Sequence, residues 1–241
     1  MLSSQGQLAL DTLTQTLDST SFEIHPFKIA QYNKSVTHKR WHLPYPDDTL
    51  AFCIVSTPSY FDKIVKPYAI KNHPNIKSPV DDSTQDAFKP ALETLKSEFP
   101  NSEAIKDSDM KPGNMPKVLM QVAGHVSGSS YFHRPSEELK KKNLDKPLMG
   151  VCIHPKYGGW FAFRGVFVCP DVLEPDFEAV ELCPGYDMSL GDKAVELFNA
   201  DWKDSAYRNI LKVEEKYSDE QIEFFITPPT DRMKLVETWL N

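Results

Sequence analysis

The sequence predicts a single α+β or mixed α/β domain that covers residues 1–241. The segment 49–56 is a short, nearly continuous apolar run, which is typical of a buried strand. The apolar residues of 88–99 recur at helical spacing, which indicates an amphipathic helix of several turns. Two further apolar segments within 150–169 flank a short turn and favour a β-hairpin. Strands and helices therefore alternate along the chain around a central hairpin.

Proline positions refine the elements expected in the first half of the chain. Pro26 breaks its strand or places it at a sheet edge, because proline has no backbone N–H. Pro67 bends or ends the helix that contains it. The elements expected here are a helix over 4–18, a strand over 22–29, a loop over 33–48, the strand over 49–56 and a helix over 61–68.

Capping residues set the expected starts of helices in the second half. Asn114 can cap a helix that has Pro116 in its first turn and the valines of 118–126 on one face. Ser218 and Gln221 have the spacing of a capping box. The other elements expected are a short strand around Ile105, strands over 150–154 and 160–169, an acidic connection over 170–188, and helices over 194–202, 205–216, 222–225 and 230–240.

Composition excludes several classes of protein. The net charge of −7 and the pI of about 5.5 argue against a general binder of nucleic acid or anionic membranes. The N-terminus lacks the features of a signal peptide, and no apolar run approaches the roughly 20 residues that span a bilayer. Without a C-x-x-C or zinc-site spacing, the cysteines are expected to be buried free thiols in a reducing, cytoplasmic compartment. These cysteines are Cys53, Cys152, Cys169 and Cys183.

One arginine stands out in the expected hairpin. Strand alternation places Arg164 on the face of Trp160, Ala162, Val166 and Val168, with the phenylalanines of 161–167 on the other. A guanidinium on an apolar face is either a structural salt bridge, an edge residue that reaches water, or an anion site for a ligand carboxylate.

The hairpin register places a glycine beside that arginine. If His154 pairs with Trp160, Gly150 lies opposite Arg164, where a missing side chain leaves room for a ligand. This arrangement predicts that Gly150→Asp abolishes ligand binding, by bulk and by pairing with Arg164.

A small-residue segment, Gln121–Phe132, forms the second candidate region. Gly124 and Gly128 lie four residues apart, on one helical face with Gln121 and nearly with His125. Such a face allows either close packing against another element or the approach of a broad, flat ligand.

These segments resemble the methylmalonic aciduria and homocystinuria type C family of cobalamin-trafficking proteins. The resemblance implies the flavin nitroreductase fold, a mixed and mainly antiparallel sheet flanked by helices. The segments that carry it are HLPYPDDTLAFCIVSTPSYFDKIVKPY at 42–68, KVLMQVAGHVSGSSYF at 117–132, GVCIHPKYGGWFAFRG at 150–165, AYRN at 206–209 and YSDEQIEFFITPPTDR at 217–232.

The resemblance also implies two sets of site residues. Relatives carry tyrosines and a glutamine where this chain has Phe132, His133 and Arg134, so contacts there differ. Glutathione binding is implied for Arg164, Arg208 and Arg232. Cobalamin binding is implied for Asp107, Val118, Leu119, Met120, Gln121, His125, Phe132, His133, Arg134, Gly150, Cys152 and Phe163.

The activity implied is glutathione-dependent removal of the upper alkyl ligand from base-off cobalamin, together with reductive removal of cyanide. FMN or FAD, or glutathione, supplies the electrons for the second reaction, and the family type D protein is the expected partner. No protein nucleophile or protein ligand to cobalt is expected. Cys152 lies in an apolar strand, and neither His125 nor His154 fits the D-x-H-x-x-G motif of other corrinoid proteins. The alternatives are a non-catalytic cobalamin carrier and a flavin nitroreductase that does not use cobalamin.

Overall fold

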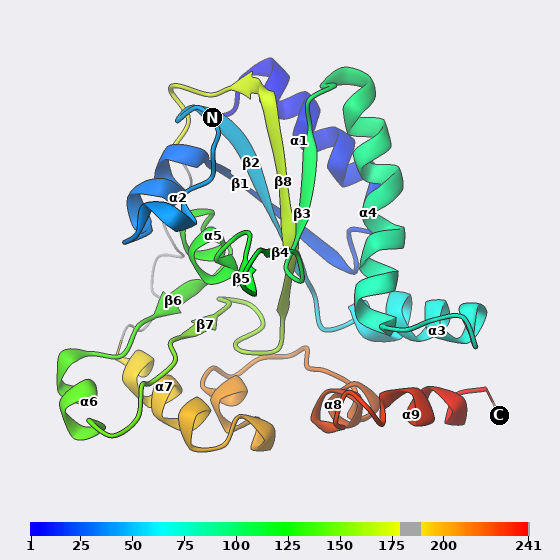
Figure 1. Ribbon diagram of the computed structural model, residues 1–241, viewed down its shortest axis with the longest axis vertical. Helices are drawn as coiled ribbons and strands as arrows, with labels where there is room; N and C mark the ends of the chain where they lie inside the picture. Colours follow the sequence, from blue (N-terminus) through cyan, green and yellow to red (C-terminus); the bar gives the residue numbers. More distant parts are fainter. Residues whose placement is uncertain (179–188, 241) are drawn as a thin grey trace.

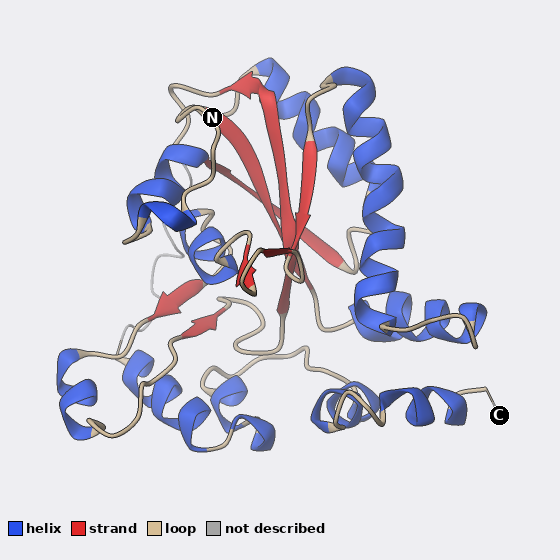
Figure 2. Ribbon diagram, in the orientation of Figure 1, coloured by secondary structure: helices blue, strands red, loops and turns tan. Residues whose placement is uncertain are grey.

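The computed structural model describes residues 1–178 and 189–240. Its central feature is a four-stranded antiparallel sheet with the order β1-β2-β8-β3 (Figures 1 and 2). The strands are β1 (Phe22–Lys28), β2 (Thr49–Ser56), β3 (Glu103–Lys106), β4 (Met110–Lys111), β5 (Met115–Pro116), β6 (Tyr131–His133), β7 (Val151–Ile153) and β8 (Ala162–Leu173). The α+β class expected from the sequence is confirmed.

Helices cover both faces of this sheet (Figure 1). Apolar residues of α1 and α4 pack on one face, and those of α2 and α5 pack on the other. Among the described residues, no helix has the length and apolar character needed to cross a bilayer. The helices are α1 (Ser4–Thr16), α2 (Ile29–Ser35), α3 (Lys66–Asn72), α4 (Pro79–Glu98), α5 (Met120–Val126), α6 (Glu137–Lys142), α7 (Leu190–Ala200), α8 (Asp219–Ile226) and α9 (Arg232–Thr238).

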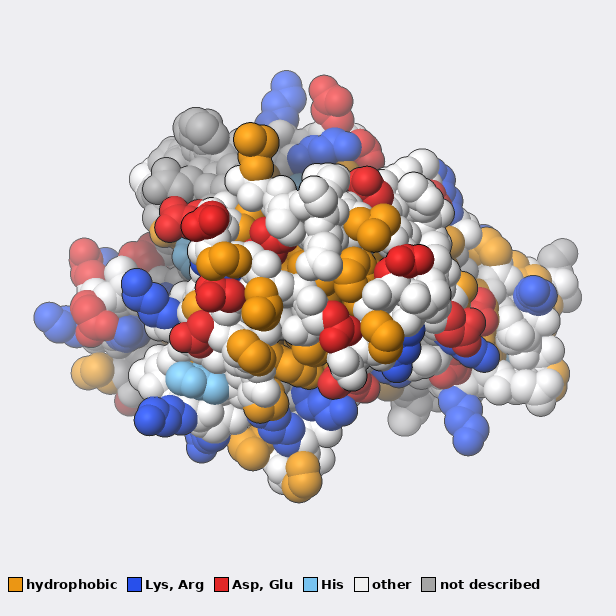
Figure 3. All heavy atoms as spheres, turned by 90° about the horizontal axis from the view of Figure 1, so that it is seen from above, with side chains coloured by type: hydrophobic (Ala, Val, Ile, Leu, Met, Phe, Trp, Pro, Cys, Tyr) orange, Lys and Arg blue, Asp and Glu red, His pale blue; other side chains and the backbone are white. Residues whose placement is uncertain are grey.

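A smaller unit lies beside one end of the sheet, where β6 and β7 pair and α6 and α7 pack against them (Figure 2). Its core contains Leu139, Val151, Ile153, Ala194 and Val195. On the face of the molecule seen in Figure 3, acidic and basic side chains are interspersed with apolar ones.

Several expected elements are confirmed with their physical reasons. All residues of β2 are buried, as its continuous apolar run predicts. Pro26 lies in β1, which is an edge strand and can lack one N–H without losing a sheet hydrogen bond. Ser218 caps α8 by accepting a hydrogen bond from the Gln221 N–H, but the predicted capping box is incomplete because the Gln221 Oε1 atom has no hydrogen-bond partner among the described residues. The helix that contains Pro67 does not end there; a π-helical turn precedes α3, and Pro67 lies in the first turn of α3.

Three expected elements are wrong. Asn114 does not cap a helix; it has φ 56° in the turn between β4 and β5, and α5 begins only at Met120. The segment 205–216 contains only a short 3-10 helix, Ala206–Asn209. The loop expected over 33–48 contains the end of α2 and a 3-10 turn, and Ile29 starts α2 instead of ending a strand. The expected thiol Cys183 lies outside the described residues.

The hairpin prediction is also wrong. The turn closes early, because His154 and Gly158 exchange backbone hydrogen bonds of 2.8 and 2.9 Å, and Gly158 has φ 59°. The chain then leaves β7, which pairs with β6, and enters the main sheet as β8. Gly150 therefore does not lie opposite Arg164.

A β-bulge changes the alternation along β8. Ile54 pairs with Gly165 and Val55 with Phe163, so Arg164 is the extra residue on its strand. Phe163 consequently packs with the core that contains Val166 and Val168, and not with the core of Phe167. Arg164 and Phe163 thus point to opposite faces of the sheet.

Candidate functional site

The start of α5 groups four of the residues implied for cobalamin. Val118 and Met120 are buried, Leu119 is half-buried and Gln121 is exposed. The Leu119 N–H donates a 2.8 Å hydrogen bond to the Tyr32 hydroxyl, which ties the start of this helix to α2. The buried pair anchors α5 on the sheet and leaves Gln121 accessible to a ligand.

The small-residue face of α5 serves packing at Gly124. A Cβ atom added to Gly124 would lie 2.3 Å from the Phe163 ring and 2.9 Å from the Ser130 hydroxyl. The glycine is needed because the Phe163 ring occupies the space that a side chain would fill. Phe163 in turn makes an edge contact with Phe161, with ring centroids 5.3 Å apart. Of the two alternatives for this face, close packing is the one found at Gly124.

A second glycine makes room for an aromatic ring in the smaller unit. A Cβ atom on Gly150 would lie 2.6 Å from the His133 carbonyl oxygen and 2.7 Å from the Phe132 ring. Phe132 lies directly opposite Cys152 in the pairing of β6 with β7. The β6–β7 ribbon therefore brings together four residues that the sequence separates into two segments.

A cavity of about 640 Å³ opens beside this ribbon. His125 and Tyr131 meet edge to face with ring centroids 5.0 Å apart, and Tyr131 lies 4.6 Å from His133. The residues that line the cavity are Ser35, His125, Tyr131, Phe132, His133, Arg134, Ser136, Ser189, Gly191 and Asp192. The lining combines aromatic rings with a larger number of polar and charged groups, which suits a large organic ligand that itself carries polar groups.

Burial keeps the imidazoles of the cavity neutral at physiological pH. It lowers the pKa of His133 to about 4, with a further contribution from nearby His125. Burial and the Arg134 guanidinium likewise lower the pKa of His125. The buried Nδ1 atom of His125 has no hydrogen-bond partner within the described residues, so it is available to a ligand.

Arg164 and Asp107 lie together at another place, where β3 ends. The Asp107 N–H donates to the Arg164 carbonyl oxygen at 3.1 Å. Burial raises the pKa of Asp107, and the neighbouring Arg164 guanidinium offsets this only in part. Asp107 is therefore grouped with an arginine implied for glutathione and is not among the residues that line the cavity.

The guanidinium of Arg164 is buried and incompletely bonded. It donates from Nε to the Ser56 hydroxyl at 2.9 Å and lies 4.6 Å from the Tyr60 ring centroid. Its Nη2 atom has no hydrogen-bond partner within the described residues. An unpaired donor on a buried charge is costly, so a ligand carboxylate here would satisfy a need of the folded protein.

The other two arginines implied for glutathione are held by protein groups. Arg232 donates from Nε to the carbonyl oxygens of Phe224 and Thr227, both at 3.1 Å, and from Nη2 to that of Phe225 at 3.2 Å. Arg208 donates to the Gly159 carbonyl oxygen. Its guanidinium also lies 4.9 to 5.6 Å from the ring centroids of Tyr207, Trp160 and Tyr217. The name arginine region denotes the three arginines implied for glutathione, Arg164, Arg208 and Arg232.

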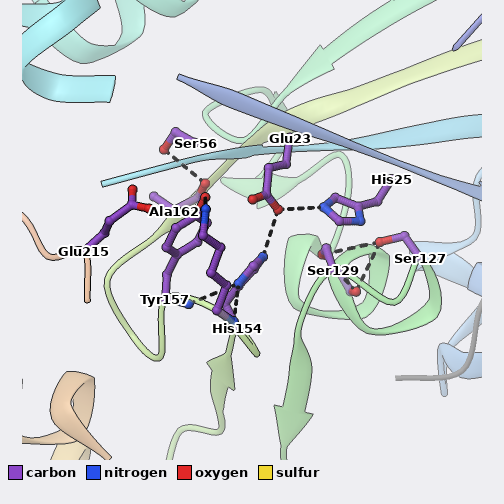
Figure 4. A network of polar contacts seen from close by, with 11 residues as sticks. Glu23, His25, Ser56, Ser127, Ser129, His154, Tyr157, Ala162 and Glu215 are labelled. Atoms are coloured by element: carbon purple, nitrogen blue, oxygen red, sulfur yellow. Dashed lines mark hydrogen bonds and ion pairs between the residues drawn. The ribbon is translucent and has the colours of Figure 1, made fainter. Parts of the chain in front are cut away.

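Sequence reasoning missed a cluster formed by Glu23, His25 and His154 (Figure 4). The Glu23 Oε2 atom lies 3.0 Å from His154 Nε2 and 3.1 Å from His25 Nε2. Although burial raises the pKa of Glu23, these histidine hydrogen bonds hold it well below its usual range. The sequence shows that Glu23 and His25 share one face of a strand. It gives no sign that they contact His154, which lies 131 positions after Glu23.

The ligand atoms of this cluster are close enough to hold a metal, but its hydrogen bonds argue otherwise. The Nδ1 atom of His154 accepts hydrogen bonds from the N–H groups of Lys156 and Tyr157, at 3.1 and 3.3 Å. The proton of the neutral ring is therefore on Nε2, directed at Glu23. A metal on Nε2 would move that proton to Nδ1, where it would face two N–H donors. The cluster is better explained as a hydrogen-bonded network.

The buried thiols fit no catalytic role. Burial raises the pKa of Cys53 and Cys169 to about 12 and raises that of Cys152 as well. All three cysteines are free, and Cys152 is half-buried beside the Gln121 carbonyl oxygen. A thiol with a raised pKa is a poor nucleophile near neutral pH.

Comparison with known proteins identifies relatives along almost the whole chain. The model of the methylmalonic aciduria and homocystinuria type C family matches residues 21–236. A chicken protein named cyanocobalamin reductase / alkylcobalamin dealkylase is 41% identical over 94% of each chain. The human protein of that name is 35% identical, over 93% of this chain and 79% of the relative.

A solved structure agrees with these relatives. The crystal structure of a B12-trafficking protein, CblC, from C. elegans has a TM-score of 0.90 and 31% sequence identity. The likeness covers 99% of this chain and 97% of the worm chain. The chain therefore belongs to the methylmalonic aciduria and homocystinuria type C family.

Proposed function

We propose that this protein processes cobalamin in the cytoplasm: it binds the vitamin base-off, removes the upper alkyl ligand or cyanide, and passes the product on. The observation that carries the proposal is the likeness, over nearly the whole chain, to proteins named for these two reactions. The cavity beside β6 and β7 supports it, because its size and aromatic lining suit part of a large organic ligand.

The dealkylation step needs a thiolate but no protein nucleophile. The sulfur of glutathione attacks the carbon bonded to cobalt, and a sulfur–carbon bond forms as the cobalt–carbon bond breaks. Both electrons of the broken bond stay on cobalt, which leaves cob(I)alamin and a thioether. The protein contributes by holding the two reactants together in a productive orientation. This division of roles agrees with the raised pKa of the Cys152 thiol.

Arg164 is the residue best suited to bind glutathione. Its buried Nη2 donor lacks a partner among the described residues, and glutathione carries two carboxylates. Arg208 and Arg232 already donate to backbone carbonyl oxygens, so they contribute to the ligand only through their remaining N–H groups. Asp107 lies beside Arg164, and its carboxyl group, when ionised, would repel further anionic groups near this guanidinium.

Cyanide removal requires an electron and not a nucleophile. Reduction of the cobalt from the trivalent to the divalent state releases cyanide as an anion. Reduced FMN or FAD, or glutathione, would supply the electron. The family type D protein is the proposed recipient of the product.

Two measurements on the purified protein test this function. Titration with methylcobalamin should shift its visible absorption to shorter wavelength as the lower base leaves the cobalt. Anaerobic incubation with glutathione should then give cob(I)alamin and the methyl thioether in equal amounts. Base-off binding without turnover would show a carrier, and the absence of both binding and turnover would contradict cobalamin processing.

The variant Arg164→Gln tests whether Arg164 binds glutathione and not cobalamin. We expect at least a tenfold weaker glutathione affinity, because a charge-assisted bond to a carboxylate is lost. Methylcobalamin affinity should change by less than threefold. Arg40→Gln is the matched control, since Arg40 is an arginine over an aromatic ring elsewhere on the surface. Equal glutathione affinity in Arg164→Gln and the parent would contradict the assignment of Arg164.

A further inference from the structure

Arg134 lies at the cavity as a cation that has no acidic partner among the described residues. It is exposed, and its guanidinium lies 5.3 Å from the Phe132 ring centroid. Its Nη2 atom donates a long hydrogen bond of 3.4 Å to the Ser35 carbonyl oxygen. No carboxylate within residues 1–178 and 189–240 forms an ion pair with it. The ring beneath orients the planar group while most of its donors stay available.

Among the described residues that line the cavity, Arg134 is the one that carries a positive charge near neutral pH. The imidazoles of His125 and His133 are neutral there because burial lowers their pKa values. Asp192 is the carboxylate among the described residues of the lining. Both of its oxygens accept hydrogen bonds from Ser136, one from the N–H at 3.1 Å and one from the hydroxyl. An anionic group of a ligand would therefore bind toward Arg134 and away from Asp192.

We propose that Arg134 binds the phosphodiester of the cobalamin nucleotide tail, so that this chain prefers corrinoids that carry the tail to those that lack it. The inference rests on the proposed function, because it names the part of that ligand which the cavity recognises. Among the peripheral groups of the corrin ring, the phosphodiester is the one anion, and a guanidinium fork matches its two free oxygens. Arg134 acts in ligand recognition and takes no part in breaking the bond to cobalt.

The test compares two corrinoids on three proteins. Hydroxocobalamin carries the nucleotide tail, whereas cobinamide lacks both the phosphodiester and the base. Dissociation constants are measured by absorption titration for the parent, for Arg134→Gln and for Arg40→Gln. Arg40 is a matched control because its guanidinium also lies 5.3 Å from a ring centroid, that of Trp41, and it does not line the cavity.

We expect Arg134→Gln to bind hydroxocobalamin about tenfold more weakly, as for the loss of one charge-assisted contact. Its affinity for cobinamide should stay within twofold of the parent, and Arg40→Gln should match the parent for both ligands. Arg134→Lys should recover part of the loss, since it keeps the charge without the fork. Equal weakening for both corrinoids, or no weakening for either, would overturn the proposal. A parent protein that binds neither corrinoid would contradict the proposed function itself.

Discussion

The arginine region and the cavity differ in how far the protein satisfies its own polar groups. In the arginine region, Arg232 is bonded to three carbonyl oxygens and Arg208 is surrounded by aromatic rings. In the cavity, His125 keeps a buried nitrogen without a partner among the described residues, and Arg134 has one long hydrogen bond. Arg164 differs from Arg208 and Arg232 and resembles His125, because it too keeps a buried polar atom that has no partner among the described residues.

This difference separates residues that hold the fold from residues that are available to ligands. When a guanidinium donates its hydrogen bonds to backbone carbonyl groups, replacing it lowers the stability of the fold whether or not a ligand is bound. A polar atom left unpaired in a folded protein costs free energy, which a ligand can recover on binding. Replacing Arg208 or Arg232 should therefore mainly change unfolding, whereas replacing Arg134 or Arg164 should mainly change ligand binding.

The largest effect is expected for Gly150→Asp. A side chain there overlaps the His133 carbonyl oxygen and the Phe132 ring, and a carboxylate beside a carbonyl oxygen is unfavourable. Overpacking and the poorly placed charge together should lower the free energy of unfolding by about 4 kcal/mol in urea titrations. Cobalamin affinity should fall as Phe132 moves.

Met149→Asp is the control for that variant, because Met149 is the exposed neighbour and should tolerate the same charge. A Gly150→Asp protein with parental stability and parental cobalamin affinity would contradict the packing seen at β6 and β7. The pairing with Arg164 that the hairpin register predicted plays no part in this expectation, since the two residues are not opposed.

Acid should destabilise the protein through His133. Its pKa of about 4 in the folded state lies below the value of about 6.5 for an exposed histidine, so the unfolded chain takes up the proton first as pH falls. The contribution of this histidine is complete above pH 6.5 and is lost as pH falls toward 4, by at most about 3 kcal/mol. Urea titrations at a series of pH values across that range measure how the free energy of unfolding changes with pH.

His133→Phe should flatten the pH dependence, whereas replacing the exposed His38 by Phe should leave it unchanged. If His133→Phe kept the full acid sensitivity of the parent, the loss of stability would have to come from other groups. The experiment also tests the neutral state of the cavity on which the role of Arg134 depends.

The sequence predicts local features of this molecule better than long-range pairing. The strand over 49–56 and the helix around 88–99 follow from periodicity that each segment carries alone. The bulge at Arg164 depends on which strands lie beside β8, and β6 is hidden in a segment that looks continuous with a helix. One extra residue at the bulge was enough to reverse the predicted faces of the strand.

Long-range contacts in the functional site are likewise not predicted by the sequence. The resemblance names residues one by one, but it does not say which of them share a place. Asp107 is implied for cobalamin, yet it lies beside Arg164 at the end of β3. The contact of Glu23 with His154 joins an edge strand to the turn after β7, and no periodicity in either segment encodes it.

Arg232→Ala should lower stability more than it changes glutathione binding. Its three hydrogen bonds satisfy carbonyl oxygens at the end of α8, where a positive charge also favours the helix. We expect a loss of about 2 kcal/mol in the free energy of unfolding. Glutathione affinity, measured by calorimetry below the unfolding transition, should change by less than threefold. A tenfold loss would instead place this guanidinium on the ligand.

Arg208→Lys should have the smallest effect, because lysine keeps the charge but not the planar stacking. The guanidinium lies near the rings of Trp160, Tyr207 and Tyr217, and such contacts contribute about 1 kcal/mol when partly desolvated. Thermal unfolding measures the change, with the exposed Arg40→Lys expected to cost less than 0.5 kcal/mol, roughly the value for surface sites. If both replacements cost the same, the three rings add nothing beyond one exposed contact, and Arg208 would then be as free as Arg134 to bind an anion.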